Sequence, residues 1–343
     1  MMPYESYRRF EAERPKSLAE QRAADARRGE LAAAISRPVI AASARIRAVV
    51  RRPRNSITER TMEMATQDSG RQVVSADGTT IAYDSYGKGP LVVLVAAVTS
   101  DRKFKGYVSL AKALSDRFQV VTYDRRGRGD SGESGPFAAE REIEDLAAVI
   151  AAEGGRAHLW GGSSGGALAL RAAAAGIGVV RLAVYEVPFM VDPADKLPTA
   201  DFSQRLDALV GAGNRRGALQ HFLRNALGLP ALLVTAMPLL PVWKRVEAMA
   251  DTLRYDWAAL GDHNMHGNPL RAEEWSGVTV PALVAYGAKS PSRLQKGSRA
   301  LAEVLPSAQL QEISGMRHSI NARVLAPALA EFFAAGQPAT CAL

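Results

Sequence analysis

The segment HLWGGSSGGA, residues 158–167, joins a predicted strand at 157–160 to a predicted helix at 167–175. It contains the pattern G-x-S-x-G in two frames, one centred on Ser163 and one centred on Ser164. A serine in a tight strand-to-helix turn has unusual backbone angles, and small neighbouring residues leave room for that turn. We favour Ser163 as a nucleophile because its frame starts directly after the strand and leads into the helix. Ser164 would then supply its backbone N–H to an oxyanion hole.

Strand and helix signals alternate on both sides of this turn. Continuous or alternating apolar runs predict strands at 73–75, 80–85, 91–97, 118–123, 157–160, 179–185, 282–286 and 309–313. Amphipathic runs predict helices at 106–115, 143–153, 167–175, 293–305 and 324–333. Strands that alternate with helices form a mostly parallel sheet with helices on both faces. The predicted fold class is therefore α/β, with a doubly wound sheet.

The alternation lapses over residues 188–276, where proline-broken helical segments predict a helical lid inserted into the sheet domain. The core then comprises 67–187 and 277–336, and a short tail follows at 337–343. Residues 1–66 carry almost no strand signal and are expected to form a basic extension, disordered or weakly helical. Residues 1–60 of that extension carry a net charge of +7 out of the chain's +8, so we expect no nucleic-acid binding by the core.

The composition is that of an ordinary globular protein, with 47% hydrophobic and 23% charged residues. Cys341 is the only cysteine, which excludes an intrachain disulfide and a cysteine-based metal site. No apolar run reaches the roughly 18 to 20 residues of a membrane span, so we expect a soluble, cytoplasmic protein. No phosphate-binding glycine loop, haem motif or zinc motif is present, so no cofactor and no metal is expected. The sequence makes no prediction of the oligomeric state.

Two further motifs accompany the serine turn, in the same order along the chain as in a known family. DRRGRGDS at residues 124–131 matches D-x-R-G-x-G-x-S, and GMRH at 315–318 matches G-x-x-H. With these motifs the chain resembles an α/β-hydrolase-fold serine hydrolase over about three-quarters of its length. The resemblance implies an α/β-hydrolase fold, a nucleophile at Ser163 and a general base at His318. The other histidines are expected in a strand, in a lid helix and in a lid loop: His158, His221, His263 and His266.

The carboxylate that orients the base is the point at which the sequence departs from the commonest family pattern. The family usually carries Asp in the turn after the strand at 282–286, but the turn here reads GAKSP and ends in Ser290-Pro291. Some members carry the acid at the end of the preceding strand, where Glu186 stands in this chain. In this placement the chain is similar to zearalenone-type lactonases and to some haloalkane dehalogenases. Glu186 is therefore the predicted acid, and Asp192 is the reserve candidate.

The second oxyanion donor also departs from the family habit. The family often has His-Gly after its third strand, and this chain has Ala96-Ala97-Val98. The donor is a backbone N–H, which any residue except proline supplies. By position, Val98 and Ser164 are the expected donors of the oxyanion hole.

The predicted activity is hydrolysis of a carboxylic ester or lactone through an acyl-enzyme on Ser163. The predicted lid is rich in apolar side chains, which favours a small, uncharged, mainly apolar substrate. Two alternatives stay open. One is a non-catalytic member of the fold that binds a small ligand, and its support is the missing turn carboxylate. The other is a cofactor-free haloperoxidase-like enzyme, which would keep the same serine, histidine and acid.

Overall fold

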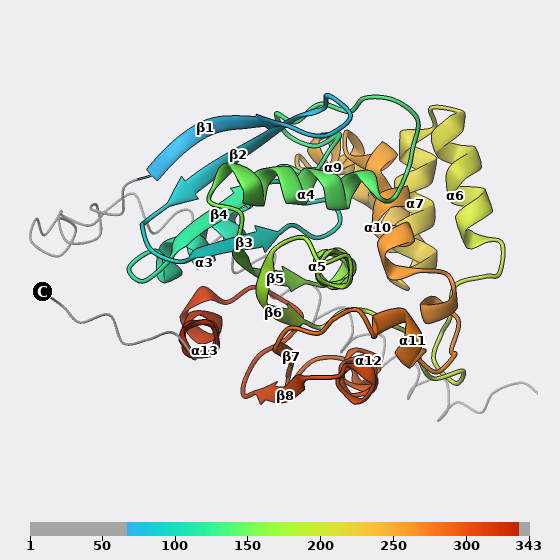
Figure 1. Cartoon of the computed structure of the whole chain (residues 1–343). Coiled ribbons are helices and arrows are strands. Elements are labelled where there is room, and N and C mark those ends of the chain that lie inside the picture. Colours follow the sequence, from blue (N-terminus) through green and yellow to red (C-terminus); the bar gives the residue numbers. More distant parts are fainter. Residues whose placement is uncertain (1–66, 336–343) are drawn as a thin grey trace, which may run out of the picture. The chain divides into compact units, whose positions relative to one another are not determined.

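One sheet of eight strands forms the centre of the described part of the chain, residues 67–335 of a computed structural model. The strands are β1 (Gln67–Val74), β2 (Thr80–Tyr86), β3 (Leu91–Val95), β4 (Gln119–Tyr123), β5 (Ala157–Gly162), β6 (Val179–Tyr185), β7 (Ala282–Gly287) and β8 (Ala308–Ile313). They lie in the order β1-β2-β4-β3-β5-β6-β7-β8 (Figure 1). β2 pairs antiparallel with β1 and β4, and every other pair is parallel. The predicted α/β-hydrolase architecture is confirmed, whereas the predictions for 1–66 and 337–343 lie outside the described residues.

Helices cover both faces of the sheet. α3 (Lys105–Leu114) and α13 (Ala322–Ala334) pack on one face, and α4 (Arg141–Ala152), α5 (Ser164–Ala174) and α12 (Ser292–Val304) pack on the other. The side chains of β3 alternate between the two layers, with Val92 and Leu94 in the first core and Val93 and Val95 in the second. This two-residue alternation explains why the strand is a continuous apolar run, since both of its faces are buried.

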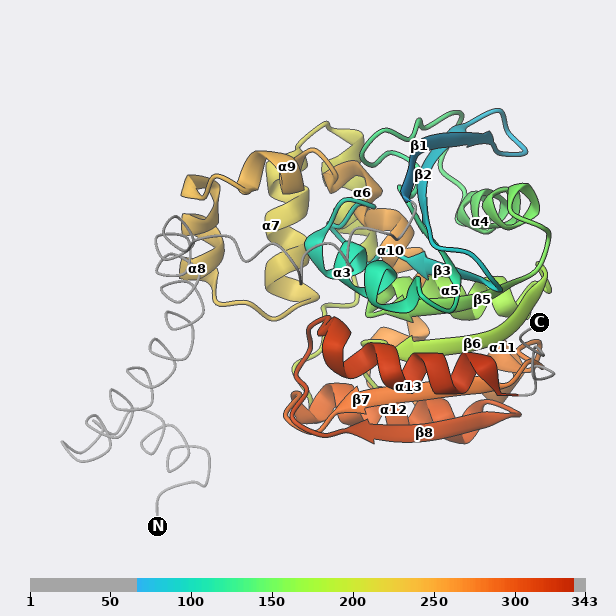
Figure 2. The same cartoon turned by 90° about the vertical axis from the view of Figure 1, so that its left-hand side faces the viewer.

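A group of helices lies between β6 and β7, and we call residues 188–276 the helical insertion. Its α-helices are α6 (Phe202–Gly211), α7 (Arg215–Asn225), α8 (Ala231–Ala236), α9 (Trp243–Glu247), α10 (Leu253–Leu260) and α11 (Ala272–Trp275). Figure 2 shows α6 to α9 beside one end of the sheet. Helix α10 packs against α5, which directly follows the serine turn. Among residues 67–335, no helix has the length and apolar character needed to cross a membrane.

The serine turn differs from its predicted bounds at both ends. β5 continues to Gly162 because Gly161 and Gly162 pair with Val184 and Tyr185 of β6. Helix α5 begins at Ser164, three residues before the predicted start. Glycines have low propensity for both helix and strand. The sequence pattern therefore indicated neither the end of β5 nor the start of α5 correctly.

The chain reverses its direction of travel across the sheet at β3. From β3 it passes to β4 on one side, and β5 then pairs with β3 on the other side. In parallel α/β sheets, ligands bind beyond the carboxyl ends of the strands at such a switch point. Val98 follows β3 and Ser163 follows β5, so both candidate residues lie at that point.

Candidate active site

Ser163 occupies a strained turn between β5 and α5. Its φ is 53° and its ψ is −134°. The turn is fixed by the Ser163 N–H, which donates to the Tyr185 carbonyl at 2.8 Å, and by close backbone packing. A Cβ on Gly161 would lie 2.4 Å from the carbonyl oxygen of Gly165, and a Cβ on Gly165 would lie 2.3 Å from the carbonyl oxygen of Val95. The small residues are therefore a steric requirement of the turn.

Glu186 and His318 are brought together from segments that are 132 residues apart, since His318 Nδ1 lies 2.6 Å from Glu186 Oε2. Glu186 follows β6 directly, and its side chain is fully buried, whereas 40% of the His318 side chain is exposed. The second carboxylate oxygen, Oε1, accepts the Gly287 N–H at 2.7 Å. Burial opposes ionisation of Glu186, but hydrogen bonding to His318 and to the Gly287 amide outweighs it and lowers the pKa of the carboxyl. The carboxylate is thus charged at neutral pH and faces the imidazole.

Residues around this pair hold the histidine loop in place. The Tyr185 hydroxyl donates to the Arg317 carbonyl at 2.9 Å, directly before His318 in the chain. Ser290 stands at the turn where the family usually has Asp, and its buried hydroxyl makes no hydrogen bond of normal geometry with the described residues. It still lies close enough to Glu186 to help lower the pKa of that carboxyl. The carboxylate that faces His318 therefore follows β6, whereas the turn after β7 carries a hydroxyl group.

One expected contact is not made in the structure, and the reserve acid lies away from His318. Within the described residues, no hydrogen bond joins Ser163 Oγ to His318 Nε2, a contact that often forms only when substrate is bound. Asp192, the reserve acid, lies elsewhere: its carboxylate accepts the Ala194 N–H at 2.8 Å and pairs with Lys296. Glu186, and not Asp192, is the carboxylate that faces His318.

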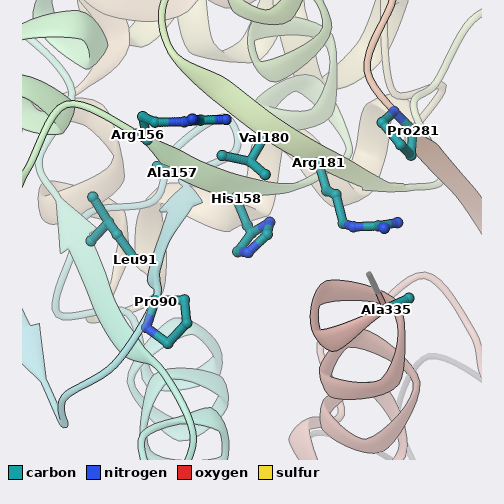
Figure 3. A pocket seen from close by; sticks show the side chains of 9 residues that line it. All are labelled: Pro90, Leu91, Arg156, Ala157, His158, Val180, Arg181, Pro281 and Ala335. Atoms are coloured by element: carbon teal, nitrogen blue, oxygen red, sulfur yellow. The ribbon is translucent and has the colours of Figure 1, made fainter. Parts of the chain in front are cut away.

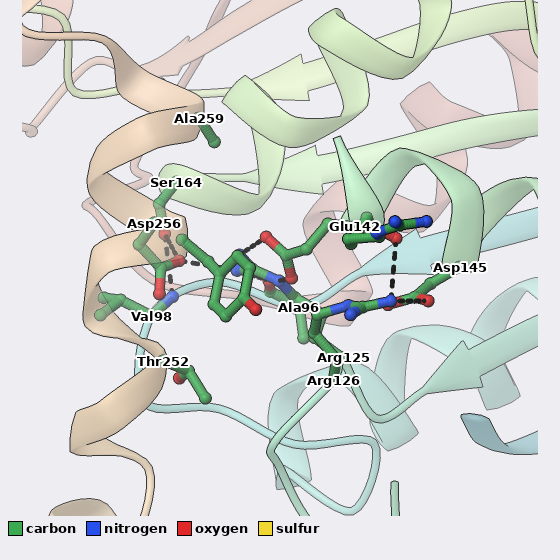
Figure 4. Close-up of polar contacts among 12 residues, drawn as sticks. Ala96, Val98, Arg125, Arg126, Glu142, Asp145, Ser164, Thr252, Asp256 and Ala259 are labelled. Atoms are coloured by element: carbon green, nitrogen blue, oxygen red, sulfur yellow. Dashed lines mark hydrogen bonds and ion pairs between the residues drawn. The ribbon is translucent and has the colours of Figure 1, made fainter. Parts of the chain in front are cut away.

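The amide of Val98 faces the serine turn, as its predicted role requires, but it already has an acceptor. The Val98 N–H donates to Ser164 Oγ at 2.9 Å, and Ser164 Oγ donates to Asp256 Oδ1 at 2.8 Å (Figure 4). The other predicted donor, the Ser164 N–H, is at the first position of α5, where an amide has no acceptor within the helix. The two predicted donors are thus linked through one hydroxyl group.

Three residues other than glycine have positive φ among residues 67–335: Thr99 at 54°, Ser163 at 53° and Glu186 at 51°. Each belongs to one part of the candidate site, namely the loop after β3, the serine turn and the end of β6. Left-handed backbone at such residues typically costs about 1–3 kcal/mol each. The strain of the described chain is therefore concentrated where the predicted chemistry lies.

A buried network of charges, which the sequence analysis did not identify, lies beside the serine turn (Figure 4). Asp256 of α10 bonds Arg125 Nη1 at 2.6 Å and Arg128 Nη2 at 2.5 Å. Arg125 also forms a two-pronged pair with Glu142 of α4, at 2.6 and 2.5 Å. All four side chains are at most 3% exposed. Both arginines belong to the DRRGRGDS motif, which is therefore more than a turn signature.

The remaining histidines serve packing and backbone contacts. His158 lies in β5 as predicted and stacks on Phe333 with ring centroids 5.0 Å apart, and burial lowers the pKa of His158 to about 4. It lines a cavity with Arg156 and Arg181 (Figure 3), at the strand starts and hence at the sheet edge opposite Ser163.

The other three histidines belong to the helical insertion. In each of them, one ring nitrogen lies within hydrogen-bond distance of a backbone carbonyl; the three are His221, His263 and His266. Across residues 67–335, no three metal-binding side chains are grouped.

A model of the alpha/beta hydrolase family matches residues 91–329. The chain belongs to the alpha/beta hydrolase family. An alpha/beta hydrolase from Sphaerobacter thermophilus is 42% identical to this hydrolase, and the match covers 77% of this chain and 100% of that chain with a TM-score of 0.69. The comparison with curated proteins gives no match.

More distant solved structures share the fold of this hydrolase. An esterase from a Rhodococcus species is 23% identical over 78% of this chain and 99% of its own, with a TM-score of 0.55. An enol-lactonase from Burkholderia xenovorans is 22% identical over 77% of this chain and 98% of its own, with a TM-score of 0.50.

Proposed function

We propose that this hydrolase cleaves a carboxylic ester or lactone through an acyl-enzyme on Ser163. The observation that carries the proposal is the 2.6 Å contact between Glu186 and His318, which follow β6 and β8 in the same sheet as the serine turn. A buried, ionised carboxylate on Nδ1 keeps the ring proton there and leaves Nε2 free to act as a base. A ligand-binding protein has no need of such a pair.

In the proposed reaction, Ser163 Oγ attacks the carbonyl carbon while His318 Nε2 takes the hydroxyl proton. The negative charge that develops on the carbonyl oxygen is stabilised by the backbone N–H groups of Ser164 and Val98. Collapse of the tetrahedral intermediate breaks the ester C–O bond, and the leaving alcohol receives the proton from His318. Water then attacks the acyl group with His318 as base, which releases the acid and restores Ser163.

The helical insertion is proposed to act as a lid over this site and to favour uncharged, apolar substrates. Its aromatic residues pack mainly on one another, as Phe202 does on Trp257 with ring centroids 4.0 Å apart. The charges nearest the serine turn neutralise each other, because the two carboxylates of Asp256 and Glu142 balance the two arginines, Arg125 and Arg128. A charged acyl group would therefore find no free opposite charge in this network.

The test is labelling with a fluorophosphonate probe, followed by peptide mass spectrometry, together with hydrolysis of p-nitrophenyl acetate, butyrate and octanoate. We expect wild-type protein to be labelled on Ser163. In Ser163→Ala, labelling is lost and kcat falls by at least about 10⁴-fold, while the circular dichroism spectrum is unchanged. Ser290→Ala, which removes a buried hydroxyl from beside Glu186, is the comparison variant: it is still labelled on Ser163 and loses far less kcat than Ser163→Ala. Turnover that survives in Ser163→Ala would contradict the proposal.

A further inference from the structure

The peptide group between Ala97 and Val98 is held at both of its polar ends. Its carbonyl oxygen, on Ala97, accepts a hydrogen bond from Arg128 Nη1 at 2.7 Å. Its N–H, on Val98, donates to Ser164 Oγ at 2.9 Å. Because the peptide group is planar, rotation of its plane would break both bonds, so the direction of the Val98 N–H is fixed before any substrate binds.

Both partners of that peptide group are held in turn by one carboxylate. Asp256 Oδ2 accepts from Arg128 Nη2 at 2.5 Å, and Asp256 Oδ1 accepts from Ser164 Oγ at 2.8 Å. An ionised carboxylate only accepts hydrogen bonds, so the Ser164 hydroxyl must point its proton at Asp256. Its lone pairs then face the Val98 N–H. We propose that Asp256, on α10 of the helical insertion, is a positioning residue that orients the oxyanion-hole amide of Val98 through Ser164 and Arg128.

A third contact strengthens the same loop. Arg125 Nη1 donates to the Ala96 carbonyl at 3.0 Å and to Asp256 Oδ1 at 2.6 Å. Asp256 is fully buried, and although burial opposes its ionisation, Arg125 and Arg128 lower the pKa of the carboxyl. Buried ion pairs add little net stability, because desolvation offsets their attraction. We therefore infer that the buried pairing of Asp256 with Arg125 and Arg128 serves to fix the geometry of the loop after β3 rather than to stabilise the fold.

The inference rests on the proposed function, since an oxyanion hole matters only when an acyl group is transferred. In the reaction, the substrate oxygen shares the Val98 N–H with Ser164 Oγ as a three-centre hydrogen bond. The Ser164 hydroxyl thus orients the Val98 N–H, and this N–H can still stabilise the charge that develops on the substrate oxygen. Because Asp256 belongs to the helical insertion, docking of α10 on α5 also completes the catalytic geometry.

The test compares three variants of the full chain with p-nitrophenyl butyrate as substrate and measures kcat, KM and the urea midpoint of unfolding. Asp256→Asn keeps the side-chain shape and removes the charge, and Ser164→Ala removes only the linking hydroxyl. Asp145→Asn is the matched control, because Asp145 is equally buried and accepts from Arg126 at 2.7 and 2.8 Å. Neither Asp145 nor Arg126 has a hydrogen bond to the loop after β3 in the described structure.

We expect kcat to fall by about 10- to 100-fold in Asp256→Asn and by about 10-fold in Ser164→Ala, as for a misplaced oxyanion donor. KM stays within about threefold of the wild-type value in both, because ground-state binding uses the hole little. Asp145→Asn keeps kcat within about threefold even where its urea midpoint falls as far as that of Asp256→Asn.

Two results would overturn the inference. One is an unchanged or raised kcat in Ser164→Ala, which would mean that the hydroxyl competes with substrate or does nothing; this variant decides the matter if Asp256→Asn does not fold. The other is an equal loss of kcat in Asp256→Asn and Asp145→Asn, which would mean a structural role alone. Fluorophosphonate labelling separates these results from failure of the proposed function. Wild-type protein that is not labelled on Ser163 refutes both ideas, whereas labelled protein with an unaffected Ser164→Ala refutes only the positioning role.

Discussion

Replacement of Glu186 by glutamine tests the acid assignment more sharply than truncation would. Glu186 accepts two N–H groups with its two oxygens, Gly287 N–H at 2.7 Å and His318 Nδ1 at 2.6 Å. A glutamine has one carbonyl oxygen and one NH₂ group, so it can satisfy only one of these donors. If the oxygen stays on the Gly287 N–H, the NH₂ group faces His318 Nδ1 and the ring proton moves to Nε2. If the amide is flipped, two donors face each other in a buried site.

The first arrangement is expected, because it avoids a buried donor without an acceptor. It leaves His318 in the tautomer that cannot take a proton from Ser163. The same carboxylate-to-amide change in the well-studied Ser-His-Asp enzymes lowers kcat by about 10⁴-fold through the wrong tautomer. We therefore expect kcat of Glu186→Gln to fall by about 10³- to 10⁴-fold, equivalent to about 4–5.5 kcal/mol of transition-state stabilisation.

The assay is steady-state hydrolysis of p-nitrophenyl butyrate between pH 6 and pH 9, with circular dichroism as the check on folding. The pKa of Glu186 is lowered, so the wild-type carboxylate stays charged throughout this range. Ser290→Ala is the comparison variant and loses far less kcat than Glu186→Gln, since its hydroxyl is only one of several groups that lower the pKa of Glu186. A folded Glu186→Gln that retains more than a tenth of kcat would refute the reasoning, as would a larger loss in Ser290→Ala.

Two further predictions concern stability. Gly165→Ala should lower the free energy of unfolding by about 1–3 kcal/mol or more, because the new Cβ meets the Val95 carbonyl oxygen at 2.3 Å. It should also abolish labelling of Ser163. The control is Gly211→Ala in α6, where a Cβ meets nothing within 4 Å; in urea unfolding it should be neutral or stabilising by up to about 1 kcal/mol. Burial lowers the pKa of His158 from 6.5 to about 4, so between these values the unfolded chain binds a proton that the folded chain does not. The free energy of unfolding should therefore fall by about 2 kcal/mol from this group between pH 6.5 and pH 5, and this part of the pH dependence should disappear in His158→Phe; an identical slope in the variant would contradict the assignment.

The elements of the sheet could be predicted because their signals are local. The apolar runs at 80–85 and 91–97 depend only on neighbouring residues, and β2 and β3 begin where they were expected. The first strand was predicted at 73–75, but β1 begins six residues earlier, at Gln67. Glu186 could be proposed because some members of the family carry the acid at the end of this strand, which faces the same edge of the sheet as the serine turn.

Asp256 could not be predicted in this way. It lies 92 residues after Ser164 in a segment, LRYDWAAL, whose single acidic residue would be solvent-exposed in most amphipathic helices. Its burial depends on how the helical insertion docks on the core, which no local pattern encodes. The useful signal was chemical: Arg125 and Arg128 follow a buried strand in a tight turn, and arginines buried there require partners from elsewhere in the chain.

The three left-handed residues have a consequence for attempts to engineer this hydrolase. A screen that selects only for heat resistance rewards the relief of backbone strain, and glycine at Thr99, Ser163 or Glu186 relieves it most directly. Two of these exchanges, at Ser163 and Glu186, remove side chains of the proposed triad. The thermostable variants selected would therefore include proteins that fold well but have no activity. Selection for survival after heating should therefore be coupled to turnover at every round, and libraries should leave these three codons fixed.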